Sequence, residues 1–135
     1  MAVTIVLHEP KELFERCEAE RRAGKRIGFV PTIGALHGGH LSLVQGCAER
    51  RADFRVLSIF VNPLQFGQNE DFGRYPRTFE ADLARCEAGG VDVVYAPSPE
   101  HMYPRGFQSH VEVEGLTQRF EGTFRPPHFR GVTTV

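Results

Sequence analysis

The sequence contains no tryptophan, no Cys-x-x-Cys pair and no surplus of either charge. Its 16 lysine and arginine residues against 17 aspartate and glutamate residues give a net charge of −1, which excludes the broad positive surface of a dedicated nucleic-acid-binding protein. Apolar runs stay below the ~20 residues that a membrane helix needs, and the first residues lack the pattern of a signal peptide. Cys17, Cys47 and Cys86 are odd in number and widely spaced, which favours reduced thiols. We therefore expect a cytoplasmic protein without nucleic-acid or membrane partners.

The 135 residues have an ordinary globular composition, with 41% hydrophobic and 24% charged residues, and suit one domain. Apolar runs of strand length alternate with stretches of helical spacing. This order predicts an α/β fold, a Rossmann-like parallel sheet with flanking helices and right-handed crossovers. Strands are expected at 27–30, 54–61 and 91–95, with a strand or extended lead-in at 3–7, and helices at 10–23, 41–48 and 79–88.

Local signals add detail to two of these helices and to the end of the chain. Thr78 is the expected N-cap of the third helix, and Gly89–Gly90 is expected to end it. Beyond Pro97 the signals are weaker: alternation at 107–113 predicts a half-exposed strand, and 116–120 predicts a short helix. Helical spacing predicts two apolar stripes. Leu41, Val44 and Ala48 form the one in the second helix, with Leu43 and Cys47 beside it, and Phe79, Leu83 and Cys86 form the one in the third.

The loop at 31–40 follows a predicted buried strand, and ligands of open parallel sheets collect beyond the carboxyl ends of the strands. Three glycines let its backbone approach a ligand, and the next helix offers unpaired N–H groups to an anion. His37 and His40 lie three residues apart at the start of that helix, an arrangement that allows both imidazoles to face one phosphate. An ordinary turn whose histidines only cap the helix is the alternative. A metal site is disfavoured because no carboxylate or cysteine lies nearby in the sequence.

A second polar cluster follows the predicted strand 54–61. Asn62 and Gln65 carry neutral donors and acceptors that suit a small hydroxy acid, although they could equally satisfy the backbone of their own loop. The loop they open runs to Arg77, and its length favours a functional loop over a plain linker. Arg77 itself is as consistent with a surface salt bridge as with a ligand contact.

A third cluster gathers two arginines and one histidine within six residues. Arg125 precedes a rigid Pro126–Pro127 turn, and His128 and Arg130 follow it. The planar fork of arginine suits carboxylates and phosphates. Solvated charges in front of a helix are the alternative interpretation.

In this order and spacing, these clusters resemble the pantoate–β-alanine ligase family. The resemblance extends over nearly the whole chain from residue 26, and its first segment is shared with a wider nucleotidyltransferase group. It implies an ATP-dependent ligase, with Mg²⁺ accompanying the nucleotide, that activates pantoate as pantoyl adenylate and joins it to β-alanine to give pantothenate, AMP and pyrophosphate. It also implies a homodimer. The segments that carry it are GFVPTIGALHGGHLSLV at 28–44, SIFVNPLQF at 58–66, RYPRT at 74–78 and HFRGV at 128–132.

The resemblance also implies individual roles. His40 takes the position of the family's proton donor, and His37 that of its paired phosphate contact. Gln65 matches the residue that holds pantoate and helps to place β-alanine, and Asn62 matches its neighbour in that pocket. Arg125 and His128 match residues that line the far side of the family's ligand-binding cleft. The implied ATP-binding loop consists of Pro31, Thr32, Ile33, Gly34, Ala35, Leu36, His37, Gly38, Gly39 and His40.

Three features depart from the family pattern. Ile33 stands where methionine is usual, Gly38 stands where an acidic residue is usual, and the chain is about half as long as family members. We interpret residues 1–135 as the N-terminal part of the ATP- and pantoate-binding catalytic domain, apparently truncated, with the C-terminal lid domain absent and little or no turnover expected. The alternatives are a nucleotide-binding module without turnover and another nucleotidyltransferase, against which the Asn62–Gln65 segment argues.

Overall fold

Four parallel strands form the sheet of this chain. In the computed structural model, which describes residues 3–67, 73 and 78–135, every neighbouring pair of strands is parallel, and the spatial order is β1-β4-β3-β2. The predicted α/β fold with a Rossmann-like parallel sheet is confirmed. The strands are β1 (Ile5–Leu7), β2 (Ile27–Thr32), β3 (Phe54–Ile59) and β4 (Val93–Tyr95).

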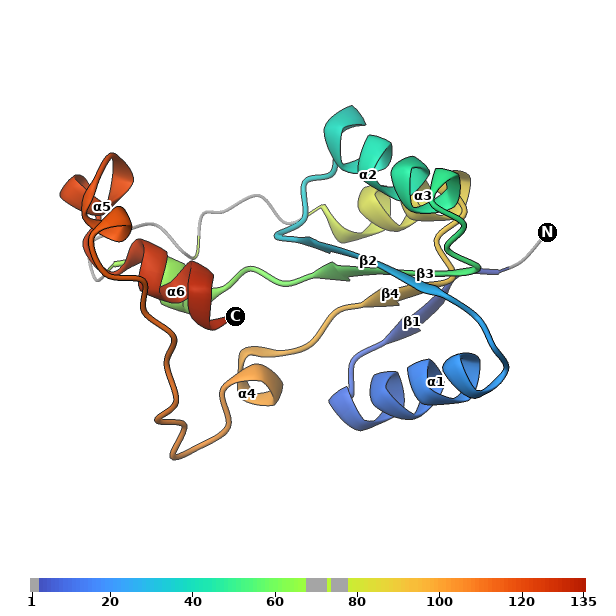
Figure 1. Ribbon diagram of the computed structural model, residues 1–135, viewed down its shortest axis with the longest axis horizontal. Coiled ribbons are helices and arrows are strands. Elements are labelled where there is room, and N and C mark those ends of the chain that lie inside the picture. Colours follow the sequence, from blue (N-terminus) through green and yellow to red (C-terminus); the bar gives the residue numbers. More distant parts are fainter. Residues whose placement is uncertain (1–2, 68–72, 74–77) are drawn as a thin grey trace.

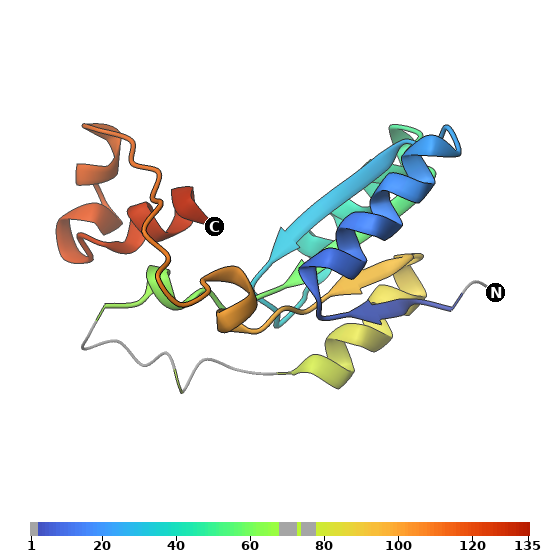
Figure 2. The ribbon, with the colours of Figure 1, turned by 90° about the horizontal axis from the view of Figure 1, so that it is seen from below.

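Helices cover both faces of the sheet. Figures 1 and 2 show α1 (Pro10–Arg22) on one face, and α2 (Gly38–Glu49) and α3 (Phe79–Gly89) on the other. Because successive strand residues point to opposite faces, β3 contributes to two cores. Phe54 packs in the core beneath α1, while Leu57 packs in the core beneath α2 and α3. Burial on both faces explains why this strand reads as a nearly continuous apolar run.

The predicted face of α3 is confirmed. Cys86 is fully buried in the core, with Phe79 and Leu83 packed against it. Gly90 ends the helix in the left-handed conformation at φ 75°, which its missing side chain allows. The face predicted for α2 is partly wrong, because Ala48 is exposed and Cys47 packs on the core in its place.

One prediction about a helix end is confirmed in position, and one about a strand end is wrong. Thr78 is the N-cap residue of α3, as predicted, but its side chain makes no capping hydrogen bond; its hydroxyl donates to the carboxylate of Asp82. Strand β2 does not end before Pro31 but continues through it to Thr32. Because β2 is an edge strand, a residue without an N–H group costs no hydrogen bond between strands there.

The C-terminal part of the chain lies beyond the carboxyl ends of the strands (Figures 1 and 2). The strand predicted at 107–113 is not formed, because this segment lies beside no strand: the backbone of Val111 bonds the hydroxyls of Thr133 and Thr134 instead. None of the helices in the described residues is long and apolar enough to cross a membrane. The short elements here are η1 (Pro63–Gln65), α4 (Pro99–Met102), η3 (Leu116–Gln118), α5 (Glu121–Phe124) and α6 (His128–Thr134), of which η3 falls within the short helix predicted at 116–120.

Candidate functional site

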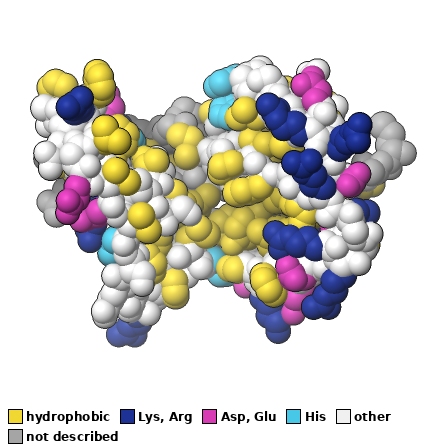
Figure 3. Space-filling view, viewed as in Figure 1, with side chains coloured by type: hydrophobic (Ala, Val, Ile, Leu, Met, Phe, Trp, Pro, Cys, Tyr) yellow, Lys and Arg dark blue, Asp and Glu magenta, His cyan; other side chains and the backbone are white. Residues whose placement is uncertain are grey.

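A cavity of about 400 Å³ opens at the carboxyl edge of the sheet, where β2, β3 and β4 end and α6 approaches η1. Figure 3 shows hydrophobic side chains gathered in the hollow between the sheet and the C-terminal part. The position is the one where parallel sheets bind their ligands. The walls are predominantly apolar with a few polar groups, which is typical of a small-molecule site. They include Pro31, Thr32 and Ile33 of the first loop, Ser58 and Phe60 after β3, Asn62, Gln65, and Val132 and Val135 of the C-terminal end.

The two histidines of the first loop form a reciprocal cap on α2. His37 is the N-cap residue, and its Nδ1 accepts a hydrogen bond from the Gly39 N–H at 3.1 Å. His40 Nδ1 accepts from the His37 N–H at 3.2 Å, and the two ring centroids are 4.1 Å apart. An imidazole nitrogen that accepts a hydrogen bond carries no proton, so the proton of each neutral ring sits on Nε2. The cap therefore leaves two Nε2–H donors side by side.

These donors are available to a ligand. His37 is exposed and His40 is half-buried, and neither Nε2 has a hydrogen-bond partner among the described residues. Burial lowers the pKa of His40, the nearby His37 lowers it further, and the Asp82 carboxylate acts in the opposite direction. His40 is consequently a neutral donor near pH 7. Capping and anion binding, which the sequence left as alternatives, use different nitrogens and are compatible.

The backbone in front of the histidines has a strained shape. Gly34 and Ala35 adopt φ values of 87° and 51°, in the left-handed region, which is unfavourable for alanine. The carboxylate of Asp82, in α3, accepts hydrogen bonds from the backbone N–H groups of Ala35 and Leu36, at 2.8 and 2.7 Å. In the sequence, Asp82 stands only as an acidic residue near the start of the helix predicted at 79–88. Its contacts with Ala35 and Leu36 span 47 and 46 residues of sequence, so no pattern of neighbouring residues could predict them.

Asn62 is 1% exposed and acts as a structural hub. Its Nδ2 donates to the Gly131 carbonyl and to Gln65 Oε1, both at 3.0 Å. Its Oδ1 accepts from the Leu64 N–H at 3.2 Å and from the Tyr103 hydroxyl at 2.7 Å. A backbone N–H can only donate and a carbonyl can only accept, so the orientation of the Asn62 amide is fixed. Asn62 thereby joins η1, α4 and α6 at the cavity wall.

Gln65 is the polar side chain that this hub presents to the cavity. Since Gln65 Oε1 accepts from Asn62, its NH₂ group is left to face a ligand. Arg125 Nη2 donates to the Gln65 carbonyl at 3.0 Å, and His128 Nδ1 lies 3.0 Å from the same oxygen. A carbonyl cannot donate, so His128 Nδ1 carries the proton. Arg125 and His128 thus hold the backbone of Gln65 and do not themselves line the cavity.

The predicted site residues therefore form two groups. His37 and His40 form one, and Asn62, Gln65, Arg125 and His128 form the other through direct hydrogen bonds. The cavity borders the second group directly, through Asn62 and Gln65, and borders the histidine loop at residues 31–33, before the histidines themselves. Arg130 is paired with Glu112 at 2.9 Å, away from the cavity. Arg77 lies outside the described residues.

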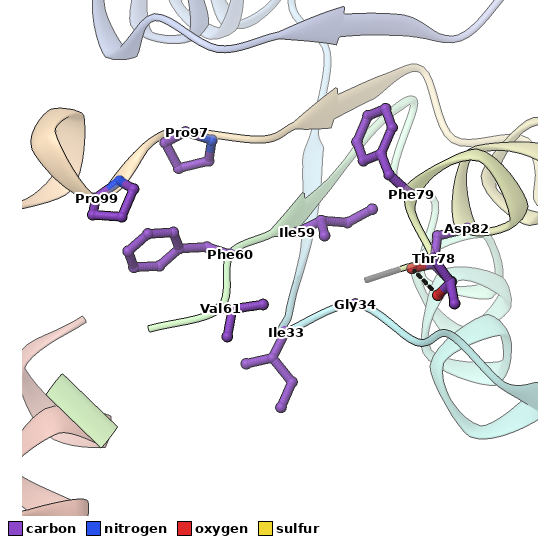
Figure 4. A pocket seen from close by; sticks show the side chains of 10 residues that line it. All are labelled: Ile33, Gly34, Ile59, Phe60, Val61, Thr78, Phe79, Asp82, Pro97 and Pro99. Atoms are coloured by element: carbon purple, nitrogen blue, oxygen red, sulfur yellow. Dashed lines mark hydrogen bonds between the residues drawn. The ribbon is translucent and has the colours of Figure 1, made fainter. Parts of the chain in front are cut away.

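A second cavity of about 390 Å³ lies behind the loop, between the end of β3 and the start of α3 (Figure 4). Ile33, Phe60 and Pro97 line both cavities. Of the described residues around the second cavity, the polar side chains are Thr78 and Asp82, and these bond each other and the loop. The polar side chains of this cavity are therefore already engaged within the protein.

Metal-binding side chains do not cluster in the described part of the chain. Among residues 3–67, 73 and 78–135, no group of three or more histidine, cysteine or carboxylate side chains is placed to hold a metal ion. The two histidines of the loop lack a carboxylate or thiolate to complete a coordination shell with them. The described residues fit an anion better than a cation.

Comparison with known proteins identifies the family. The model of the family Pantoate-beta-alanine ligase matches residues 5–135. The pantothenate synthetase of Chloroherpeton thalassium is 55% identical over 130 residues, which are 96% of this chain and 45% of that protein. That of Sulfurihydrogenibium sp. is 53% identical over 130 residues, 96% of this chain and 46% of that protein. The chain spans about half the length of these curated relatives.

Solved structures agree in fold over the same part. The crystal structure of pantothenate synthetase from Thermus thermophilus superimposes with a TM-score of 0.81 at 48% identity, covering 97% of this chain and 46% of that one. The pantoate-beta-alanine ligase from Francisella tularensis, complexed with beta-gamma ATP and beta-alanine, gives a TM-score of 0.84 at 36% identity, covering 95% and 49%. The chain belongs to the pantoate-beta-alanine ligase family.

Proposed function

We propose that this chain binds ATP and pantoate and provides these sites for the ATP-dependent ligation of pantoate to β-alanine. The observation that supports this most directly is the pair of Nε2–H donors at the start of α2, beside a cavity into which Gln65 presents its NH₂ group. A related ligase has been crystallised with an ATP species and β-alanine, which is consistent with the same ligands here.

The proposed reaction has two steps. The pantoate carboxylate attacks the α-phosphorus of ATP, a P–O bond to the carboxylate forms, and pyrophosphate leaves to give pantoyl adenylate. The amine of β-alanine then attacks the acyl carbon, AMP leaves with the former carboxylate oxygen, and the amine loses a proton as the amide of pantothenate forms. Negative charge moves towards the leaving pyrophosphate in the first step, where fixed donors stabilise it.

The residues would divide these tasks. His37 and His40 contact the phosphates through Nε2–H, and His40 occupies the position of the family's proton donor. The loop 31–40 binds ATP, with Ile33 and Gly38 in the positions where the family usually has other residues. Gln65 binds pantoate and helps to place β-alanine. Asn62 and the pair Arg125 and His128 hold Gln65, as their hydrogen bonds indicate.

Mg²⁺ is proposed as the companion of ATP. The described residues supply no carboxylate set for it, so we assign the ion to the nucleotide phosphates. We further propose that the 135 residues are the N-terminal part of the catalytic domain, that the protein is a cytoplasmic homodimer, and that this polypeptide alone binds ligands with little or no turnover. Size-exclusion chromatography with light scattering tests the dimer.

Binding and turnover can be tested separately. Calorimetry with Mg-ATP should show binding to the wild-type chain, with at least about tenfold weaker binding by His40→Ala and His37→Ala because a charge-assisted donor is lost. His110→Ala is the matched control, since His110 lies outside both cavities. Pantoate added with ATP should protect the chain from proteolysis, and a coupled assay with pantoate, β-alanine and Mg-ATP reports AMP release.

Each outcome has a distinct meaning. A folded wild-type chain that does not bind ATP would contradict the proposed function. ATP binding without protection by pantoate would favour another nucleotidyltransferase activity. AMP release at an ordinary enzymatic rate would show that these 135 residues suffice for turnover, against our expectation.

A further inference from the structure

The buried carboxylate of Asp82 is unusual for a residue that lies outside the ligand-binding loop. Its side chain is 1% exposed, and burial of a charge requires strong compensating contacts. Three donors supply them: the N–H groups of Ala35 and Leu36, and the hydroxyl of Thr78 at 3.1 Å. Arg85 Nη1 lies 3.8 Å from Oδ1. Figure 4 shows Asp82 and Thr78 beside Gly34, at the point where the loop passes α3.

The contacts clamp a single peptide segment from both sides. Asp82 accepts from the Leu36 N–H, while Arg85 donates to the Leu36 carbonyl at 2.6 Å. The next residue is His37, whose backbone N–H donates to His40 Nδ1 and so ties the His40 ring to the backbone of residue 37. The clamp therefore acts on the residue immediately before the histidine pair. It also holds Ala35 in the left-handed conformation that its own side chain disfavours.

We propose that Asp82 is a positioning residue for the histidine pair: by binding the N–H groups of Ala35 and Leu36 it fixes the loop in the shape that keeps both Nε2–H donors directed at one anionic ligand. The proposal rests on the proposed function only for the identity of that ligand, the phosphates of ATP. The placement itself rests on the buried carboxylate, its three donors and the left-handed residue that they hold.

A carboxylate suits this position better than its amide. Both oxygens of Asp82 accept, and they face donors on every side. Asparagine offers one acceptor oxygen, and its NH₂ group would meet an N–H or O–H group. The negative charge also acts on His40, because it opposes the lowering of the His40 pKa by burial and by His37.

Asp82→Asn in the whole chain is the direct test, with Thr78→Val as the matched control. Thr78→Val removes one of the three donors and keeps the charge. In Asp82→Asn, nuclear magnetic resonance should show a lower pKa for His40 than in the wild type, and hydrogen exchange at the Ala35 and Leu36 amides should be at least about tenfold faster. Mg-ATP should bind at least about tenfold more weakly. Thr78→Val should change all three readouts less.

The readouts separate this proposal from the proposed function. If folded Asp82→Asn keeps the wild-type His40 pKa and the wild-type amide protection, Asp82 is not a positioning residue. If the wild-type chain binds no ATP while the pKa and exchange change as expected, the proposed function is wrong and the positioning role stands. Should Asp82→Asn fail to fold, Arg85→Met decides: it breaks the bond to the Leu36 carbonyl and keeps Asp82, and unchanged exchange at Leu36 and His37 would overturn the clamp.

Discussion

The four hydrogen bonds of Asn62 predict a graded loss of stability along a series of substitutions. Asn62→Ala removes all four and leaves the Gly131 carbonyl with the Val135 N–H as its donor. At about 1 kcal/mol of net stability for each hydrogen bond, the cost is roughly 3 to 4 kcal/mol. Tyr103→Phe removes one bond, and Asn62 Oδ1 keeps the Leu64 N–H, so the expected cost is about 1 kcal/mol.

Urea unfolding at 25 °C measures these costs as changes in the free energy of unfolding. A domain of this size is stable by about 5 to 15 kcal/mol, so Asn62→Ala should remove a large share of that stability. Gln65→Ala is the matched control inside the same network, because it removes one of the four bonds and is expected to cost about 1 kcal/mol.

The double variant makes the reasoning refutable. Once Asn62 is alanine, the Tyr103 hydroxyl has lost its acceptor, so adding Tyr103→Phe should cost almost nothing more. Fully additive costs would show that the two side chains do not interact in solution. Equal costs for Asn62→Ala and Tyr103→Phe would show that Asn62 is not the hub of this wall.

Four further predictions concern single residues. Gly131→Ala should cost about 3 kcal/mol in urea unfolding and detach α6 from η1, because its Cβ would lie 2.3 Å from a backbone oxygen of η1. Cys86, whose burial raises its pKa to about 11, should react with iodoacetamide at pH 8 far more slowly than in urea, as mass spectrometry would show. His37→Asn should keep the cap on α2 and the stability but weaken ATP binding, since asparagine caps well and has no Nε2–H; equal ATP affinity would contradict the role of that donor. His40 has a pKa below its ordinary value, so the folded state resists its protonation. Stability should fall as the pH drops from 7.5 to 5, and less so in His40→Gln.

The elements that the sequence predicted well are those whose signals are local. The core face of α3 appears in three apolar residues at fixed helical spacing, and Gly90 ends the helix because glycine tolerates a positive φ. The strands could be located because burial on both faces requires unbroken apolar runs. The two histidines were found for a similar reason, since both lie at the start of one helix.

The predictions that failed depended on neighbours distant in sequence. Alternation at 107–113 indicates one polar and one apolar face but does not tell whether a strand is present to pair with, and the segment has none. Asp82 could not be connected with the histidine loop because 46 residues separate it from Leu36.

The histidine pair shows why interpretations that compete in a sequence can be compatible in a structure. From the spacing alone, a helix cap and a phosphate-binding pair are rival uses of the same two residues. An imidazole has two nitrogens, however, and the cap uses only Nδ1 of each ring. Because Nδ1 accepts a backbone N–H, the proton of the neutral ring lies on Nε2. The capping hydrogen bond therefore also determines which nitrogen of the ring can donate to a ligand. Aspartate could cap the helix as well but would leave no donor, because an ionised carboxylate only accepts. The cap is therefore the means by which the fold orients the two groups that we propose to contact ATP.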